Sequence, residues 1–276
     1  MNFKILLTLL LASHTALAMG SRESEQLLGL PERPGNALTG TQFIQKIKHV
    51  PQYLREKMII KEVLTGNIPE FQRTLVPVES TITSGPYQGQ KLRYWVLPDY
   101  LSIGTNDDFV RVPLNLYSIR ILARKLNLSI PTTDMVDDIY TQAQLKLKPT
   151  ALPSGRAMTT VQYFQMHNRL VQNQIEESGG TPGMLVAGHK KDVVQSLRLL
   201  AKPQAIAIYG WHMDRNQPIQ PLSTIHGAEY ADYSHGVRFV SNIVEVNGHV
   251  MDLRAVLDQK LSETLASRPA RKKPRS

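Results

Sequence analysis

Side chains that bind metals and transfer protons gather between Gly188 and Arg238. Four of the eight histidines of the chain lie in this stretch, among aspartate, serine and arginine residues. Imidazole and carboxylate groups are common zinc ligands, and imidazole gains or loses a proton near neutral pH. We therefore expect the chemical site of the protein to lie in this part of the sequence.

The spacing in this stretch is consistent with a metal centre. A catalytic zinc ion needs three nitrogen or oxygen ligands and a position left open for water. Two histidines and one aspartate would meet that need, and a third histidine follows an apolar run that predicts a strand. The expected zinc ligands are His226, Asp232 and His235, with His212 as a fourth.

A zinc-bound water also needs a base and a group that stabilises negative charge. Glu229 or His189 would serve as the general base, and Arg238 would stabilise the oxyanion. The segment from Gly188 to Asp192 is also a candidate anion site. It follows a predicted strand, and a helix beginning at Asp192 would direct its backbone N–H groups towards an anion.

A serine mechanism is the second hypothesis for the same stretch. Ser234 would be the nucleophile, one of the nearby histidines its base, and Asp192 or Asp232 the group that orients the histidine. Ser234 has a glycine on only one side, at Gly236, so the Gly-x-Ser-x-Gly motif is absent. Both hypotheses therefore remain open from the sequence.

The elements that would position these residues point to an α+β fold, with helices between two groups of mainly antiparallel strands. Periodicity and capping residues predict helices over residues 41–65, 116–126, 132–143, 158–174 and 253–266. Alternation and turn residues predict strands over residues 73–78, 91–97, 184–187, 205–211 and 236–246, with a hairpin turn at Asn247-Gly248.

Several motifs resemble those of a group of exported bacterial proteins of unassigned function, over about residues 68 to 240. They are PDYLSIG from Pro98, DFVRVP from Asp108, GHKKDVV from Gly188, YGWH from Tyr209 and YADYSHGVR from Tyr230. The resemblance implies one folded unit and export from the cell. It implies no activity, because none is assigned to that group.

The ends of the chain differ in composition from its body. A charged start, a short apolar run and Ala16-Leu17-Ala18 predict a signal peptide over residues 1–18, and no later segment is apolar enough to span a membrane. Residues 19–40 read as an extended arm, residues 41–266 as one α+β domain with a candidate joint near 178–183, and residues 267–276 as a disordered basic tail.

Composition and predicted location together suggest a function class. The chain has no cysteine, which excludes thiol catalysis, thiolate metal sites and disulfides. We expect a periplasmic or secreted hydrolase that cleaves an envelope or extracellular polymer, with peptidoglycan the leading substrate class. The basic tail has two interpretations: contact with nucleic acid or an anionic envelope polymer, and, as the favoured one, a solvated tail with no specific partner. The alternative is a non-catalytic envelope protein that binds such a polymer or serves as structure, in which the histidines hold loops together.

Overall fold

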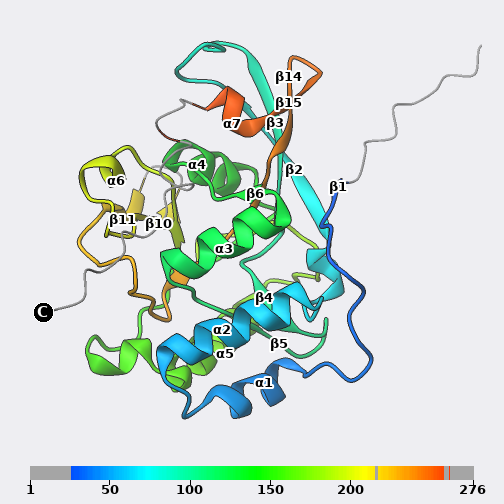
Figure 1. Cartoon of the computed structure of the whole chain (residues 1–276), viewed down its shortest axis with the longest axis vertical. Helices are drawn as coiled ribbons and strands as arrows, with labels where there is room; N and C mark the ends of the chain where they lie inside the picture. The colour runs from blue at the N-terminus through cyan, green and yellow to red at the C-terminus, as the bar shows by residue number, and fades with distance from the viewer. Residues whose placement is uncertain (1–25, 215–216, 258–260, 262–276) are drawn as a thin grey trace, which may run out of the picture.

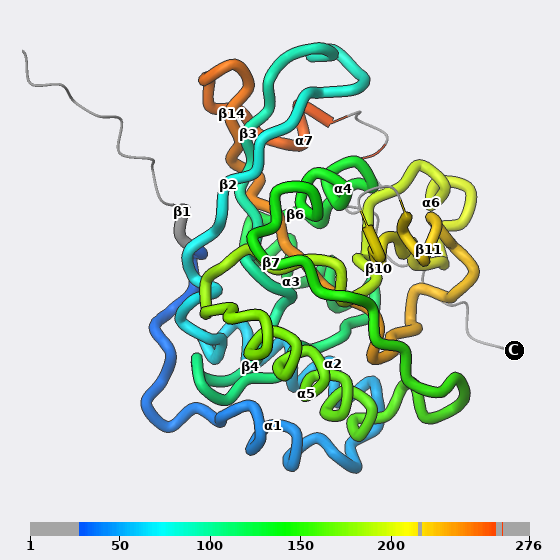
Figure 2. The backbone as a smooth tube through the Cα atoms, turned by 180° about the vertical axis from the view of Figure 1, so that it is seen from behind, coloured from blue at the N-terminus to red at the C-terminus, as the bar shows by residue number. Residues whose placement is uncertain are grey.

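The computed structural model describes residues 26–214, 217–257 and 261. The predicted signal peptide and the predicted basic tail lie outside the described residues. The protein has an α+β fold in which the strands form mainly antiparallel sheets. Three helices gather at one end of the molecule: α1 (Gly40–Ile47), α2 (Gln52–Leu64) and α5 (Val161–Glu177) (Figure 1, Figure 2). The turns of two hairpins lie at the opposite end, one between β2 (Thr74–Thr81) and β3 (Lys91–Val96), the other between β14 (Ile243–Val246) and β15 (His249–Asp252).

The helices of the described residues are mostly short, and most of them begin at a capping side chain. Thr39, Asn115, Thr132 and Thr160 each accept a hydrogen bond from a backbone N–H in the first turn of the helix that follows. The helices are α1 (Gly40–Ile47), α2 (Gln52–Leu64), α3 (Leu116–Leu126), α4 (Thr133–Gln142), α5 (Val161–Glu177), α6 (Arg198–Ala201) and α7 (Leu253–Val256), with 3₁₀ turns at Glu70–Gln72 and Arg156–Thr159.

The largest sheet combines strands from distant parts of the chain. Its order is β1-β2-β3-β13-β6, and β14 pairs with both β3 and β15. The register sets Val240 against Val96 on one side and Ser129 on the other. The strands are β1 (Gln26–Leu27), β2 (Thr74–Thr81), β3 (Lys91–Val96), β6 (Leu128–Ser129), β13 (Val240–Ser241), β14 (Ile243–Val246) and β15 (His249–Asp252).

A second sheet, of four strands, carries three of the residues expected to do chemistry: Asp192, His212 and His235. Its order is β11-β10-β9-β12, and only the β9–β12 pair is parallel. Two smaller pairs, β4–β5 and β7–β8, complete the strands. The bounds are β4 (Ser102–Gly104), β5 (Phe109–Arg111), β7 (Leu145–Lys146), β8 (Val186–Ala187), β9 (Lys191–Val193), β10 (Ile208–Asp214), β11 (Gln217–Ser223) and β12 (His235–Gly236).

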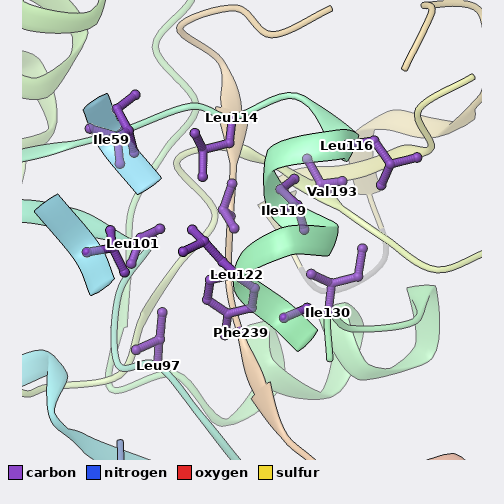
Figure 3. Packing of buried hydrophobic residues seen from close by; sticks show 14 of the residues in the cluster. Ile59, Leu97, Leu101, Leu114, Leu116, Ile119, Leu122, Ile130, Val193 and Phe239 are labelled. Carbon is purple, nitrogen blue, oxygen red and sulfur yellow. The ribbon is translucent and has the colours of Figure 1, made fainter. Parts of the chain in front are cut away.

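One core cluster joins the helical end to the second sheet. Ile119 and Leu122 on α3 pack in the same cluster as Ile59 on α2, Val193 on β9 and Phe239, and all five are buried (Figure 3). Fully burying one aliphatic or aromatic side chain stabilises a fold by about 1.5–3 kcal/mol. The cluster takes residues from both sides of the segment 178–183, so packed side chains connect the two halves of the chain.

The structure agrees with the sequence-based elements at several places and departs from them at others. Asn247 and Gly248 form the expected hairpin turn between β14 and β15, with φ angles of 49° and 81°. The helix expected to begin at Asp192 is wrong, because β9 occupies Lys191–Val193. Val193 and Val194 are both fully buried, and β-branched residues favour a strand that packs on both faces.

Candidate functional site

The candidate site lies where β12 joins the second sheet. The parallel register sets His235 beside Lys191 and Gly236 beside Asp192, while β10 pairs with the other edge of β9. Residues opposite each other on paired strands point to the same face, so His235 and Lys191 share one face of the sheet. The loop between β11 and β12 supplies the remaining side chains of the site.

His235 is the central residue of this site. Its side chain is fully buried, and neither ring nitrogen has a hydrogen-bond partner among the described residues. The carboxylate of Asp232 is its nearest charged group, at 4.0 Å from Nε2. Burial lowers the pKa of His235 to about 4, although Asp232 acts in the opposite direction. At neutral pH the imidazole is therefore uncharged, and neither nitrogen is bonded to another group of the described residues.

Asp232 is held in its ionised form by the turn around it. Its Oδ1 accepts hydrogen bonds from the backbone N–H of Ser234 at 2.7 Å and from the Ser234 hydroxyl at 2.6 Å, and its Oδ2 accepts one from Tyr230 at 3.0 Å. Burial would raise the pKa of Asp232, but His235 and these donors lower it below its ordinary value.

The same bonds decide the role of Ser234. Its hydroxyl is buried and donates its proton to Asp232, not to an imidazole. A serine nucleophile must instead pass its proton to a base such as histidine. We therefore assign Ser234 to the positioning of Asp232, and the geometry does not support the serine mechanism.

Two half-buried rings connect His235 to the surface. His226 stacks on Tyr230 with ring centres 4.2 Å apart, and Tyr230 sets its edge against His235 at 5.6 Å. The rings of His226 and His235 are 6.2 Å apart. Two imidazoles, one carboxylate and one phenol thus form a contiguous group that runs from the surface to a buried base.

Lys191 and Trp211 complete the site on the sheet. The ammonium group of Lys191 lies 4.8 Å from the centre of the Trp211 ring, and burial lowers the pKa of this half-buried lysine while Asp232 raises it. Trp211 has a φ angle of 57°, which is uncommon for a residue other than glycine, and its indole N–H is buried without a partner among the described residues. Such strained backbone tends to occur at functional sites.

Lys190, the residue before Lys191, is a second amine near the site, and it is buried. Its Nζ donates to the backbone carbonyl of Tyr233 at 2.6 Å and lies 3.4 Å from Nδ1 of His167. Burial lowers the pKa of Lys190 to about 7. Lys190 thereby fixes the loop that carries Asp232 and His235 onto the helix α5.

His189 belongs to a separate buried centre. Its Nε2 lies 3.1 Å from Oδ1 of Asp99, and Asp99 forms a buried ion pair with Arg111 in which Nη2 and Oδ2 are 2.6 Å apart. Burial would raise the pKa of Asp99, but Arg111 and then His189 lower it far below its ordinary value. Because Asp99 occupies its Nε2, the structure gives His189 a role in positioning this buried ion pair and not that of a general base.

Asp192 and Arg238 form a third buried centre with Tyr100. The Tyr100 hydroxyl donates to Asp192 at 2.7 Å, and burial raises the pKa of this carboxyl to about 6. Arg238 donates to the backbone carbonyls of Leu97 and Val186 at 2.5 and 2.6 Å and stacks over the Tyr100 ring. Both residues hold strands together. Asp192 bonds to Tyr100 and not to a histidine that could serve Ser234, and Arg238 bonds to backbone carbonyls and is not placed to stabilise an oxyanion.

His212 does not join the proposed metal ligands. Its Nε2 lies 2.8 Å from Oδ1 of Asp137 on α4, which also accepts from the Tyr209 hydroxyl, and its ring stacks on Tyr140. Within residues 26–214, 217–257 and 261, no three histidine, aspartate or glutamate side chains converge closely enough to hold a metal ion. The four expected ligands therefore divide between two places.

Comparison with known proteins gives no relative for this chain. No family model, no curated protein and no solved structure matches it. Among the described residues, no helix is both long and apolar enough to cross a membrane.

Sequence reasoning missed the partners that come from elsewhere in the chain. Asp99 and Asp137 each bind a histidine of the histidine-rich stretch, and Arg111 binds Asp99. Asp99 and Arg111 lie within the motifs from Pro98 and Asp108, so those motifs carried a usable signal. Asp137 lies on α4, outside all of those motifs, so the sequence contains no indication of its contact with His212.

Proposed function

We propose that this protein is an exported hydrolase that cleaves an envelope or extracellular polymer, with peptidoglycan as the leading substrate class. The observation that carries the proposal is His235: a fully buried imidazole with no partner for either nitrogen among the described residues. A buried polar group left without a partner costs stability, by about 1–3 kcal/mol. A folded protein that keeps such a group is more readily explained by function than by stability.

The side chains around His235 favour hydrolysis of an amide bond over a glycosidic bond. Glycosidases of the common type use two carboxyl groups on either side of the scissile bond. Here the site holds one buried carboxylate, Asp232, beside two imidazoles and an amine. That set suits water attack on a peptide carbonyl, so the peptide part of peptidoglycan is the substrate we propose.

The residues then take the following roles. His235 accepts a proton from the attacking water, and Asp232 at 4.0 Å stabilises the imidazolium that forms. Lys191 offsets the negative charge that develops on the carbonyl oxygen. When the C–N bond breaks, the imidazolium returns the proton to the leaving amine, so the base is regenerated and one water is consumed.

The test uses the purified chain, isolated peptidoglycan and chromatographic analysis of the released fragments. His235→Ala and His226→Ala should keep the fold, which melting curves like that of the wild type would show. His235→Ala should lower turnover by about 100-fold or more. His249→Ala is the matched control, because His249 is exposed on the β14–β15 hairpin.

The non-catalytic alternative makes the opposite forecast. If the histidines only hold loops together, the wild type shows no turnover and both alanine variants melt at lower temperature. Turnover that survives in His235→Ala would also overturn the proposed mechanism.

A further inference from the structure

A cavity of about 270 Å³ lies on the buried ion pair of Asp99 and Arg111, away from the proposed hydrolytic site. Both side chains line it, although the guanidinium of Arg111 is only 1% exposed and Asp99 is 3% exposed. They neutralise each other at 2.6 Å. None of Lys191, His226, Asp232 or His235 lines this cavity, so it is independent of the proposed function.

Apolar groups form part of the walls of this cavity. Phe71 and Phe109 meet edge to face with ring centres 5.2 Å apart, and the guanidinium of Arg111 lies 5.1 Å from the centre of the Phe109 ring. Ile175 and Met184 also line the cavity. The volume and lining fit a small ligand with an apolar body.

Two further carboxylates line the same cavity. Asp107 precedes β5 and Glu176 lies near the end of α5, and both are exposed. Neither carboxylate forms a hydrogen bond or an ion pair with another side chain in the part of the chain that the structure describes. Together with Asp99 they set three negative charges against the single positive charge of Arg111.

We propose that this cavity binds a small organic cation, an amine with an apolar body that packs against Phe71 and Phe109 while its charge faces Asp107 and Glu176. The net negative lining attracts a cation and repels an anion of the same shape. Arg111 does not reverse this preference, since Asp99, Asn168 and Gln172 already accept its N–H groups.

The test compares three probes of nearly equal shape on the full purified chain: benzylammonium, benzyl alcohol and benzoate. Binding is measured by calorimetry and by nuclear magnetic resonance titration in low salt. We expect saturable binding of benzylammonium, with benzyl alcohol about tenfold weaker and benzoate weaker still, as two exposed ion pairs would give. Added salt should reduce the difference between the cation and the alcohol.

Variants locate the binding. Glu176→Gln and Asp107→Asn should each weaken benzylammonium binding by about two- to fivefold, whereas they leave benzyl alcohol binding unchanged. Glu177→Gln is the matched control, because it removes the same charge one residue further along α5 and Glu177 does not line the cavity. Melting curves confirm that each variant is folded.

Three results would overturn the proposal. They are no saturable binding of benzylammonium at millimolar concentration, equal binding of all three probes, and an equal effect of Glu176→Gln and Glu177→Gln. Each of these outcomes leaves the hydrolase proposal unaffected, because the two sites share no residue.

Discussion

The ion pair between Asp99 and Arg111 offers the sharpest test of how this fold is held together. Both side chains are almost fully buried, with Arg111 Nη2 at 2.6 Å from Asp99 Oδ2 and Nε at 3.0 Å from the same oxygen. Arg111→Met keeps an apolar chain of similar length but leaves Asp99 as a buried charge without its cation. Breaking a buried pair in this way costs about 3–5 kcal/mol.

That cost is a large share of the total stability of a typical domain, which is about 5–15 kcal/mol. It corresponds to a fall in melting temperature of roughly 10 °C for a chain of this size. Chemical unfolding in urea at pH 7, followed by circular dichroism, measures the change in the free energy of unfolding directly. Arg169→Met is the control, because Arg169 is exposed, and it should change the free energy of unfolding by less than about 0.5 kcal/mol.

Two further measurements separate the ion pair from simple loss of packing. Asp99→Asn combined with Arg111→Met removes both charges, so the double variant should be more stable than the sum of the single effects predicts. Because Arg111 lowers the pKa of Asp99, the contribution of the pair is full above pH 4 and fades as the pH falls below the pKa of the unfolded aspartate. A loss below 1 kcal/mol in Arg111→Met, or strict additivity in the double variant, would refute this reasoning.

Three other predictions follow from the site and its surroundings. Burial lowers the pKa of His235 to about 4, so as the pH falls the unfolded chain binds a proton at this position before the folded chain does. The protein therefore loses stability between pH 6.5 and pH 4, and in urea titrations His235→Asn should make that loss smaller by about 3 kcal/mol. Gly236→Ala should lower stability by about 1–3 kcal/mol or more, because its Cβ would lie 2.4 Å from Tyr100 Cε1. In the control Gly29→Ala the added Cβ meets no atom within 4 Å, so the melting temperature should not change. Because no three histidine, aspartate or glutamate side chains of the described residues converge closely enough to hold a metal ion, a chelator should leave the melting curve unchanged. One zinc per chain by elemental analysis, lost in His226→Ala, would contradict this prediction.

The fold was predictable where short-range patterns decide it. The α3 helix follows its apolar spacing between Asn115 and Asn127, and Asn247-Gly248 produces the hairpin that its left-handed angles allow. The strand β9 was not predictable, because a three-residue strand gives too little periodicity and its pairing with β10 and β12 is set by the whole sheet. Tertiary contacts decided that segment.

The site was predictable only where its members are near one another in sequence. Asp232, Ser234 and His235 fall in one turn, so the sequence indicated their proximity. His189 and its partner Asp99 are 90 residues apart, and His212 and Asp137 are 75 apart. Spacing along the chain carries no information about such pairs, which is why His189 and His212 were assigned chemistry that their partners exclude.

The position of β13 has a consequence for how the chain acquires its structure. Val240 pairs with Val96 and with Ser129, so a strand from the last part of the sequence lies between two strands made much earlier. Contacts between residues so far apart in sequence slow folding, because a long loop must close before the pairing stabilises anything. During synthesis β3 and β6 have no strand between them until β13 has been made. A chain that stops before Val240 would leave the facing edges of both strands free to pair with other molecules.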